Sequence, residues 1–234
     1  MNIELSAVSY SEGGAHILKD IEFNASEHRI GVVGRNGSGK STLARLLCGL
    51  IAPSSGSVQL YGVDVFKDRH AAIKTVGMLF QNPDHQIIFP TVEEELAFGL
   101  TQLGLNSSEA SLKVAHLLEQ FEATHWLKKS VSVLSQGQRH LVCLMAILLM
   151  QPRLVILDEP YAGLDIPTAM QLNQYLSSID AAIVHISHQP ETFNHYDRVL
   201  WLEEGKIVLD DSPATVLPEF TQQMKELGRS HALV

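Results

Sequence analysis

The sequence predicts an α/β protein built around a parallel sheet. Apolar strand-like segments alternate with helical stripes along the 234 residues, and such alternation is typical of a parallel sheet covered by helices. A second observation agrees: the apolar segment 30–33 runs into a glycine-rich turn that opens a helix. With 45% hydrophobic and 18% charged residues, the chain can bury one sizeable core.

The strand-like segments come in two groups, one before residue 82 and one after residue 150. The first group comprises residues 3–10, 17–24, 29–33, 57–61 and 75–80. The second comprises residues 154–157, 183–187 and a hairpin-like pair, 198–202 and 206–210. Two helices accompany them, one with Leu43, Leu46, Leu47 and Leu50 on one face and a short one near 221–227.

Helical patterns replace the strands between residues 82 and 150. Thr91 and Glu94 have the spacing of a capping box, which predicts a helix beginning at the residue after Thr91. Ser135 and Gln138 repeat that spacing ahead of an apolar run. We therefore expect a single domain over 1–234, with a core of about 1–81 and 151–234 and an inserted helical subdomain of about 82–150.

A phosphate-binding loop follows the strand 29–33, with the sequence Gly34-Arg35-Asn36-Gly37-Ser38-Gly39-Lys40-Ser41. Its glycines let backbone N–H groups turn toward one anion, and the N-terminus of the following helix adds partial positive charge. We expect Lys40 to reach the β- and γ-phosphates of a nucleotide and Ser41 to coordinate Mg²⁺.

Two carboxylates, Asp158 and Glu159, directly follow the apolar segment 154–157. Ligands of α/β sheets bind beyond the carboxyl ends of the strands, so Asp158 is placed to hold Mg²⁺ through water. Glu159 would be the general base that polarises the attacking water. A solvated acidic turn is the alternative explanation, which the phosphate-binding loop disfavours.

The pentapeptide Leu134-Ser135-Gln136-Gly137-Gln138 stands at a second helix start. By itself a serine N-cap indicates only that a helix begins, although a helix N-terminus can bind an anion. The order of motifs indicates more. The phosphate loop, Gln81, this pentapeptide, the acidic pair, Ala162-Gly163-Leu164-Asp165 and His188 resemble the ATP-binding cassette (ABC) ATPases over nearly the whole chain. Gln136 departs from the family pattern, which has glycine there.

The resemblance implies a P-loop NTPase fold of ABC type, with a parallel-sheet core, an N-terminal antiparallel β subdomain and an inserted α-helical subdomain. It also implies hydrolysis of ATP, with Mg²⁺, in sites shared by two copies of the ATPase, most simply a homodimer. The ATP-binding residues of one copy would be Tyr10, Gly34, Asn36, Gly37, Ser38, Gly39, Lys40, Ser41 and Thr42. The second copy would contribute its signature residues Ser135, Gln136, Gly137 and Gln138, and Asp165 would lie in the loop that crosses between the copies.

Catalytic roles are implied for Glu159, His188 and Gln81. His188 would touch the γ-phosphate and hold Glu159 and the water in line. Gln81 would contact the attacking water and would join Ser41 and Asp158 at Mg²⁺. Tyr10 would stack on adenine; the alternative is an ordinary aromatic of a buried strand.

The segment 80–99 resembles the same region of energy-coupling factor (ECF) importers of prokaryotes, which take up vitamins and transition-metal ions. Its acidic run, 93–95, either stabilises a helix start or contacts basic residues of a partner. The resemblance implies two membrane partners, a transmembrane scaffold protein and a small substrate-binding protein, and a peripheral place at the cytoplasmic face of the inner membrane. The segment 158–168, with the glutamine-containing signature, is most similar to biotin-uptake ATPases.

Two other functions stay open. Cobalt or nickel uptake suits the same class of importer, because the ATPase does not touch the cargo. A soluble ABC ATPase of iron–sulfur assembly is similar in size and has no transport role. No nucleic-acid partner is expected, because the net charge is −9 and no Lys/Arg-rich stretch is present. No transmembrane helix is expected, because the longest apolar run, 141–150, is too short to span a bilayer.

Overall fold

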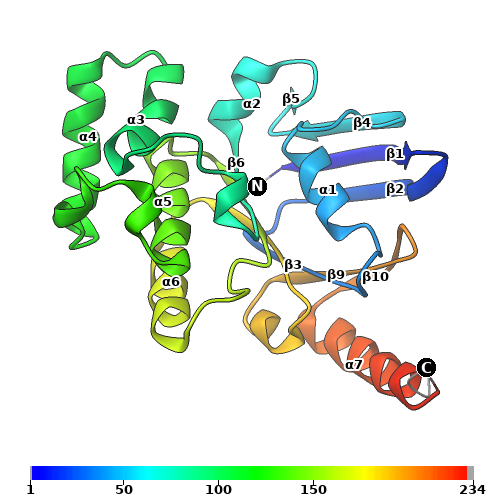
Figure 1. Ribbon diagram of the computed structural model, residues 1–234. Helices are drawn as coiled ribbons and strands as arrows, with labels where there is room; N and C mark the ends of the chain where they lie inside the picture. The colour runs from blue at the N-terminus through cyan, green and yellow to red at the C-terminus, as the bar shows by residue number, and fades with distance from the viewer. Residues whose placement is uncertain (1, 231–234) are drawn as a thin grey trace.

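The computed structural model describes residues 2–230 and arranges the strands of that range in two sheets (Figure 1). The smaller sheet is antiparallel and has the strand order β2-β1-β4-β5. Its strands are β1 (Ile3–Glu12), β2 (Ala15–Ala25), β4 (Ser55–Leu60) and β5 (Val63–Asp64). The antiparallel β subdomain implied by the resemblance is therefore present near the N-terminus.

The larger sheet is parallel except for one edge strand, in the order β10-β9-β3-β8-β7-β6. Its strands are β3 (Arg29–Val33), β6 (Val76–Leu79), β7 (Leu154–Asp158), β8 (Ala182–Ile186), β9 (Arg198–Glu203) and β10 (Lys206–Asp211). Because β3, β6, β7 and β8 run the same way, their carboxyl ends lie at one edge of the sheet. The predicted α/β class is confirmed.

Seven α-helices occur within residues 2–230: α1 (Lys40–Leu47), α2 (Arg69–Thr75), α3 (Val92–Gln102), α4 (Ser107–Gln120), α5 (Gln136–Leu149), α6 (Ile166–Ser178) and α7 (Pro213–Ser230). Four 3-10 helices join them over that range: η1 (Pro83–His85), η2 (Thr124–Trp126), η3 (Val131–Val133) and η4 (Pro190–Phe193). Helices α3 to α6 form one side of the molecule, and the antiparallel sheet lies on the other (Figure 1). Helix α7 projects away from both.

The parallel sheet is buried on both faces, because its central strands alternate between two apolar clusters. Leu154 and Ile156 of β7 belong to the cluster that also contains α1 and the antiparallel sheet. Val155 and Leu157 belong to the cluster that contains α3 to α6. Burial on both faces explains why these strands appear as near-continuous apolar runs in the sequence.

The helix starts follow local capping. Ser135 caps α5 with the predicted box: its hydroxyl accepts from the N–H of Gln138, and the Gln138 side chain accepts from the N–H of Ser135. Thr91 caps α3, which begins at the predicted residue. The capping box of α3 is incomplete, because the Glu94 carboxylate accepts a hydrogen bond from the Thr91 hydroxyl and not from the Thr91 N–H.

Some expected boundaries are wrong. Thr75 ends α2 instead of beginning a strand, and its hydroxyl donates to the carbonyl of Ala71. Leu50 lies past the end of α1 and is 46% exposed. Helix α7 is much longer than the expected 221–227, because it continues through Pro218, a residue that normally signals a break. Helices α2 and α6 lie outside the expected elements.

The division into a core of about 1–81 and 151–234 and a helical subdomain of about 82–150 stays a prediction. Within residues 2–230, none of the helices combines the length and apolarity that crossing a membrane requires.

Candidate functional site

The carboxyl edge of the parallel sheet gathers the predicted catalytic residues. Gln81 follows β6, Asp158 ends β7, Glu159 comes next, and His188 follows β8. The phosphate loop follows β3 at the same edge, and its helix α1 begins with Lys40. Together they enclose a cavity of about 600 Å³. Its lining comprises Ile17, Asn36, Gly37, Gly39, Lys40, Ser41, Thr42, Gln81, Asp158, Glu159 and His188.

The phosphate loop is held in shape by glycine and by Lys40. Gly39 caps α1 with φ +105°, and a Cβ there would lie 2.7 Å from Cδ2 of Leu18. The Lys40 ammonium donates to the carbonyl oxygens of Gly34 and Arg35, each at 2.8 Å. Burial lowers the pKa of Lys40, although nearby carboxylates, first that of Glu159, oppose the shift. A cation is thus kept at the mouth of the turn, where an anion would bind.

Asp158 is a buried carboxylate with an alcohol beside it. Its Oδ1 accepts from the hydroxyl of Ser41 at 3.3 Å. Burial raises the pKa of Asp158, and the neighbouring charge of Glu159 adds to that effect. Carboxylate, hydroxyl and the amide oxygen of Gln81 are hard oxygen ligands of the kind that Mg²⁺ prefers. This donor set fits a magnesium ion.

Glu159 is fixed from two sides. Its backbone has φ +50°, a left-handed conformation that costs a non-glycine residue roughly 1–2 kcal/mol. Its N–H donates to the carbonyl of Ile186 at 3.0 Å, which ties it to the end of β8. Its Oε2 lies 2.9 Å from Nδ1 of His188. The carboxylate therefore faces the cavity while His188 stays largely exposed.

The signature residues lie elsewhere in the chain. Ser135, Gln138 and Asp165 line a separate cavity of about 500 Å³ that contains no residue of the phosphate loop. Asp165 caps α6, its Oδ1 accepting from the N–H of Thr168 at 3.0 Å. The first turns of α5 and α6 touch, because a Cβ on Gly137 would lie 2.7 Å from Cγ2 of Thr168. One copy of the chain thus carries the two halves of the expected site in different places.

Gln136, the departure from the family pattern, reaches the loop that precedes α6. Its Nε2 lies 3.0 Å from the position of a Cβ on Gly163. Gly163 has φ +73° and belongs to the loop before Asp165. The side chain of Gln136 therefore packs beside the loop that is expected to cross between copies.

Other residues differ from their expected places. Tyr10 lies on β1, packs against the first apolar cluster and does not line the cavity. Ile17 of β2 lines it instead, a residue that no sequence motif marks. Tyr10 as the adenine contact stays a prediction. His185 is buried, with Nδ1 2.8 Å from the hydroxyl of Tyr196.

The carboxylates of the acidic run 93–95 have partners within the same chain. Glu95 is buried, and its Oε2 accepts from the N–H groups of Ile88 and Phe89, each at 2.9 Å. Glu93 pairs with Lys128. Of the two explanations offered for 93–95, stabilisation of the local structure is therefore favoured.

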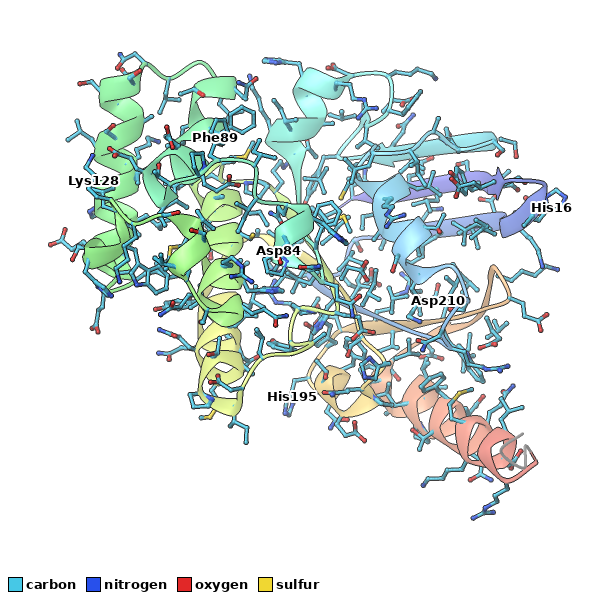
Figure 2. The ribbon with its side chains drawn as sticks, in the orientation of Figure 1. His16, Asp84, Phe89, Lys128, His195 and Asp210 are labelled. Atoms are coloured by element: carbon cyan, nitrogen blue, oxygen red, sulfur yellow. The ribbon has the colours of Figure 1, made fainter. Side chains whose placement is uncertain are left out.

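An ion pair that sequence reasoning missed connects the two functional regions. Nε of Arg139, on α5, lies 3.0 Å from Oδ1 of Asp84, on η1 just after Gln81. Figure 2 shows Asp84 between the helical side of the molecule and the sheet. Because these residues are far apart in sequence, no local pattern marks the pair.

Comparison with known proteins gives consistent matches. A family model described as ABC transporter matches residues 18–162. A biotin transport ATP-binding protein, BioM of Rhodobacter capsulatus, is 44% identical over 98% of this chain and 98% of its own. An energy-coupling factor transporter ATP-binding protein, EcfA1 of Caldanaerobacter subterraneus, is 35% identical over 94% and 82%. A solved structure, cbiO1 of Clostridium perfringens, superposes with a TM-score of 0.77 at 28% identity, covering 95% of this chain and 93% of its own.

Proposed function

The chain belongs to the ABC transporter family of ATP-binding proteins, and from that premise we propose that it powers biotin uptake through an ECF-type membrane transporter. One observation supports the choice of biotin: the similarity to a biotin transport ATP-binding protein spans nearly the full length of both chains. The cavity at the carboxyl edge of the sheet supports the chemistry, because it combines a phosphate loop with a carboxylate–histidine pair.

In this proposal the phosphate loop holds the nucleotide. Its backbone and the side chains of Asn36, Ser38 and Thr42 cradle the phosphates, and Lys40 exchanges its two loop carbonyls for phosphate oxygens. Ser41, Gln81 and Asp158 would hold Mg²⁺, which when bound would neutralise negative charge on the phosphates. Tyr10 supports the adenine.

Glu159 then accepts a proton from the attacking water, and His188 keeps that carboxylate oriented. Glu159 is suited to the task because its backbone bond to Ile186 and its contact with His188 leave it little freedom. A positioned base of this kind commonly contributes a factor of about 10² to 10⁴ to the rate.

The second half of the site comes from another copy. Ser135, Gln136, Gly137 and Gln138 form the N-terminus of α5, which offers backbone N–H groups and a positive dipole end to a γ-phosphate. Within one chain this helix start and the phosphate loop line different cavities. An ATP that touches both therefore joins two chains, and its hydrolysis releases them.

We place the membrane partners beside the segment after Gln81. Ile88 is 65% exposed there, Phe98 is 38% exposed, and the rings of Phe89 and Phe98 lie 5.1 Å apart. This apolar surface suits a helix of a transmembrane scaffold protein, with the small substrate-binding protein as a third component. Arg139 and Asp84 would carry movement of α5 to this surface. The ATPase would then lie peripherally at the cytoplasmic face of the inner membrane.

Co-purification followed by transport tests the proposal. The tagged chain is extracted with detergent from membranes, and its small membrane partner is identified. The complex is then reconstituted in vesicles and tested for ATP-dependent uptake of labelled biotin and, separately, of Co²⁺. We expect biotin uptake that Lys40→Ala abolishes. If the tagged chain is recovered with cytosolic scaffold proteins alone, the transport function is rejected. If the vesicles take up Co²⁺ and not biotin, biotin is rejected as the cargo.

A further inference from the structure

The end of β9 and the turn after it, residues 202–205, lie against the phosphate loop. A Cβ on Gly34, the first residue of the loop, would lie 2.1 Å from the carbonyl oxygen of Leu202. The N–H of Gly205 donates to the carbonyl oxygen of Ser38 at 3.1 Å. Segment 202–205 therefore contacts the phosphate loop at two separate points, residue 34 and residue 38.

Segment 202–205 is also fixed to β2, the strand that supplies Ile17 to the nucleotide cavity. The carbonyl oxygen of Gly205 accepts from the N–H of Lys19 at 2.8 Å. Gly205 has φ +78°, and a Cβ there would lie 2.3 Å from the carbonyl oxygen of Ile17. Because backbone contacts hold the segment to both β2 and the phosphate loop, it has little room to move away from the cavity.

Glu203 brings an acidic side chain to the phosphate loop. Its Oε1 lies 3.6 Å from Nη1 of Arg35, the second residue of the loop. Its Oε2 is buried and accepts no hydrogen bond from residues 2–230. A carboxylate oxygen that has lost its water without gaining a donor is unfavourable in a folded protein. The negative charge of Glu203 is thus incompletely compensated beside the proposed phosphate site.

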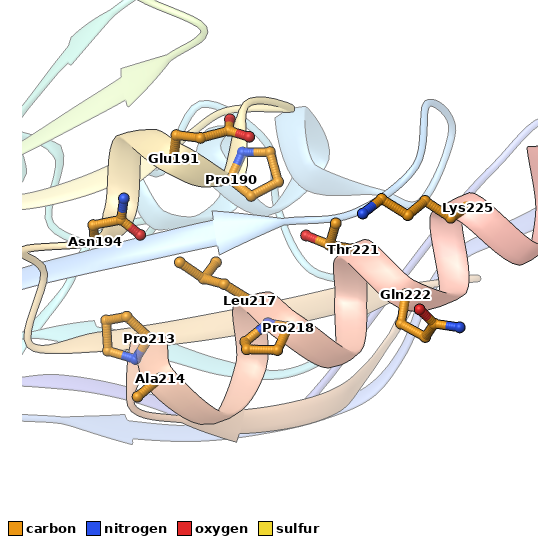
Figure 3. Close-up of a pocket in the computed structure, with 10 residues that line it drawn as sticks. All are labelled: Pro190, Glu191, Asn194, Pro213, Ala214, Leu217, Pro218, Thr221, Gln222 and Lys225. Atoms are coloured by element: carbon orange, nitrogen blue, oxygen red, sulfur yellow. The ribbon is translucent and has the colours of Figure 1, made fainter.

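Arg35 has a second acid in its neighbourhood but does not pair with it. The residue borders a hollow of about 630 Å³ that contains the acid Glu191 and the cation Lys225. Figure 3 shows Glu191 on η4 and Lys225 on α7, at the walls of the adjoining hollow. Within the described part of the chain, Arg35 forms an ion pair with Glu203 and with no other carboxylate. Glu203 is therefore the acid that restrains this guanidinium.

The charge of Glu203 also reaches the lysine of the loop. The Lys40 ammonium donates to the carbonyl oxygen of Arg35 at 2.8 Å, so Arg35 lies between the two charged side chains. Burial lowers the pKa of Lys40, and three carboxylates oppose that shift: those of Glu159, Asp158 and Glu203. A carboxylate that attracts the Lys40 ammonium repels a phosphate bound to the same ammonium.

We propose that Glu203 weakens the binding of nucleotide at the phosphate loop and thereby speeds the release of ADP. Its fixed negative charge repels the phosphates, and its contact with Arg35 engages a cation that would otherwise attract them. The inference rests on the proposed place of the phosphates at this loop. It goes beyond the hydrolysis itself, because it concerns how long the product stays bound.

Binding of ADP, the product, to the whole chain tests this role. Glu203→Gln keeps the shape of the side chain and removes its charge. Titration calorimetry should therefore give a Kd for ADP about threefold to tenfold lower than that of the parent. Release of a fluorescent ADP analogue in a chase experiment should slow by a similar factor. Glu204→Gln is the matched control: Glu204 is exposed on the same turn, so water screens its charge and the Kd should change less than about twofold.

Two further variants separate an effect of charge from damage to the loop. Arg35→Gln should raise the Kd for ADP by about threefold to tenfold, because the charge of Glu203 is then left without its cation. The chain with both Arg35→Gln and Glu203→Gln should bind ADP within about twofold of the parent, since one attraction and one repulsion are removed together. A pair that only holds the loop in shape would weaken binding in all three variants, which would overturn the inference.

Other outcomes distinguish this inference from the proposed function. If the Kd of the Glu203→Gln chain is unchanged or higher, while Lys40→Ala still abolishes binding, this inference alone is overturned. Equal tightening in Glu203→Gln and Glu204→Gln also overturns it, because net charge and not the buried carboxylate would then be the cause. If Lys40→Ala binds ADP as tightly as the parent, the proposed place of the nucleotide fails as well.

Discussion

Nδ1 of His188 lies 2.9 Å from Oε2 of Glu159, and this contact joins the ends of two neighbouring parallel strands, β7 and β8. A second tie reinforces it, since the N–H of Glu159 donates to the carbonyl of Ile186 on β8. The proposed base is thus positioned by the sheet itself.

Glu159→Gln should retain ATP binding and ATP-dependent dimerisation while hydrolysis falls by at least about 10²-fold, because the amide cannot take a proton from water. Sedimentation with ATP and a phosphate-release assay measure the two properties on one preparation. Normal turnover in this variant would remove Glu159 from its role.

His188→Ala should lower kcat by about 10²-fold and change KM for ATP much less, because the lost contact orients the base more than it binds nucleotide. His195→Ala is the matched control: His195 is exposed and, as Figure 2 shows, sits near η4. It lines no part of the nucleotide cavity. Equal losses in the two variants would contradict the role given to His188.

Gly163→Ala should slow turnover for two reasons. The loop has φ +73° there, which costs alanine roughly 1 kcal/mol, and the new methyl would lie 3.0 Å from Nε2 of Gln136. Adding Gln136→Gly removes the second cause only, so the double variant should recover part of the activity. A double-mutant cycle on ATP turnover measures this coupling, and strictly additive effects would show that Gln136 does not position the loop.

Acid should destabilise the fold through buried histidines. Burial lowers the pKa of His140 to about 4 and that of His185 to about 3, from 6.5. Between pH 6.5 and about 4 the unfolded chain binds more protons than the folded one, so the free energy of unfolding falls as pH falls. His140 alone accounts for up to about 3 kcal/mol of that loss.

His140→Leu should flatten this dependence. Urea unfolding at pH 7 and at pH 5 gives the free energies, and the difference between the two should be smaller in the variant than in the parent. His185 remains to titrate, so part of the dependence persists. An unchanged difference would mean that His140 binds protons equally in the folded and the unfolded chain.

Short local sequence patterns correctly predicted the helices and strands that contain them. The box at Ser135 marked the start of α5, and the apolar run 154–157 marked a strand buried on both faces. Helix α6 was not predicted, because polar residues flank its buried residues Leu172 and Leu176 and its large apolar side chain Met170 is exposed. A helix with this pattern lacks the apolar stripe by which helices are recognised in a sequence.

The residues of the site also fall into those that could be predicted from the sequence and those that could not. The order of motifs predicted which residues to seek, and the parallel strands bring Gln81, Asp158 and His188 to one cavity. Positions that depend on pairing between distant segments were not predictable. Ile17 lines the cavity while Tyr10 does not, which follows from how β1 and β2 pair. The contact of Gln136 with Gly163 likewise depends on how α5 and α6 pack.

The shared ATP site is tested most directly by mixing two damaged chains, both with Glu159→Gln. Lys40→Ala damages the phosphate loop, and Ser135→Arg blocks the signature. If ATP joins two copies, a pair with one chain of each kind contains one complete site. Each variant alone should sediment as a monomer with ATP and Mg²⁺, and the mixture should form dimers. A mixture that stays monomeric, while the parent Glu159→Gln chain dimerises, would contradict the account.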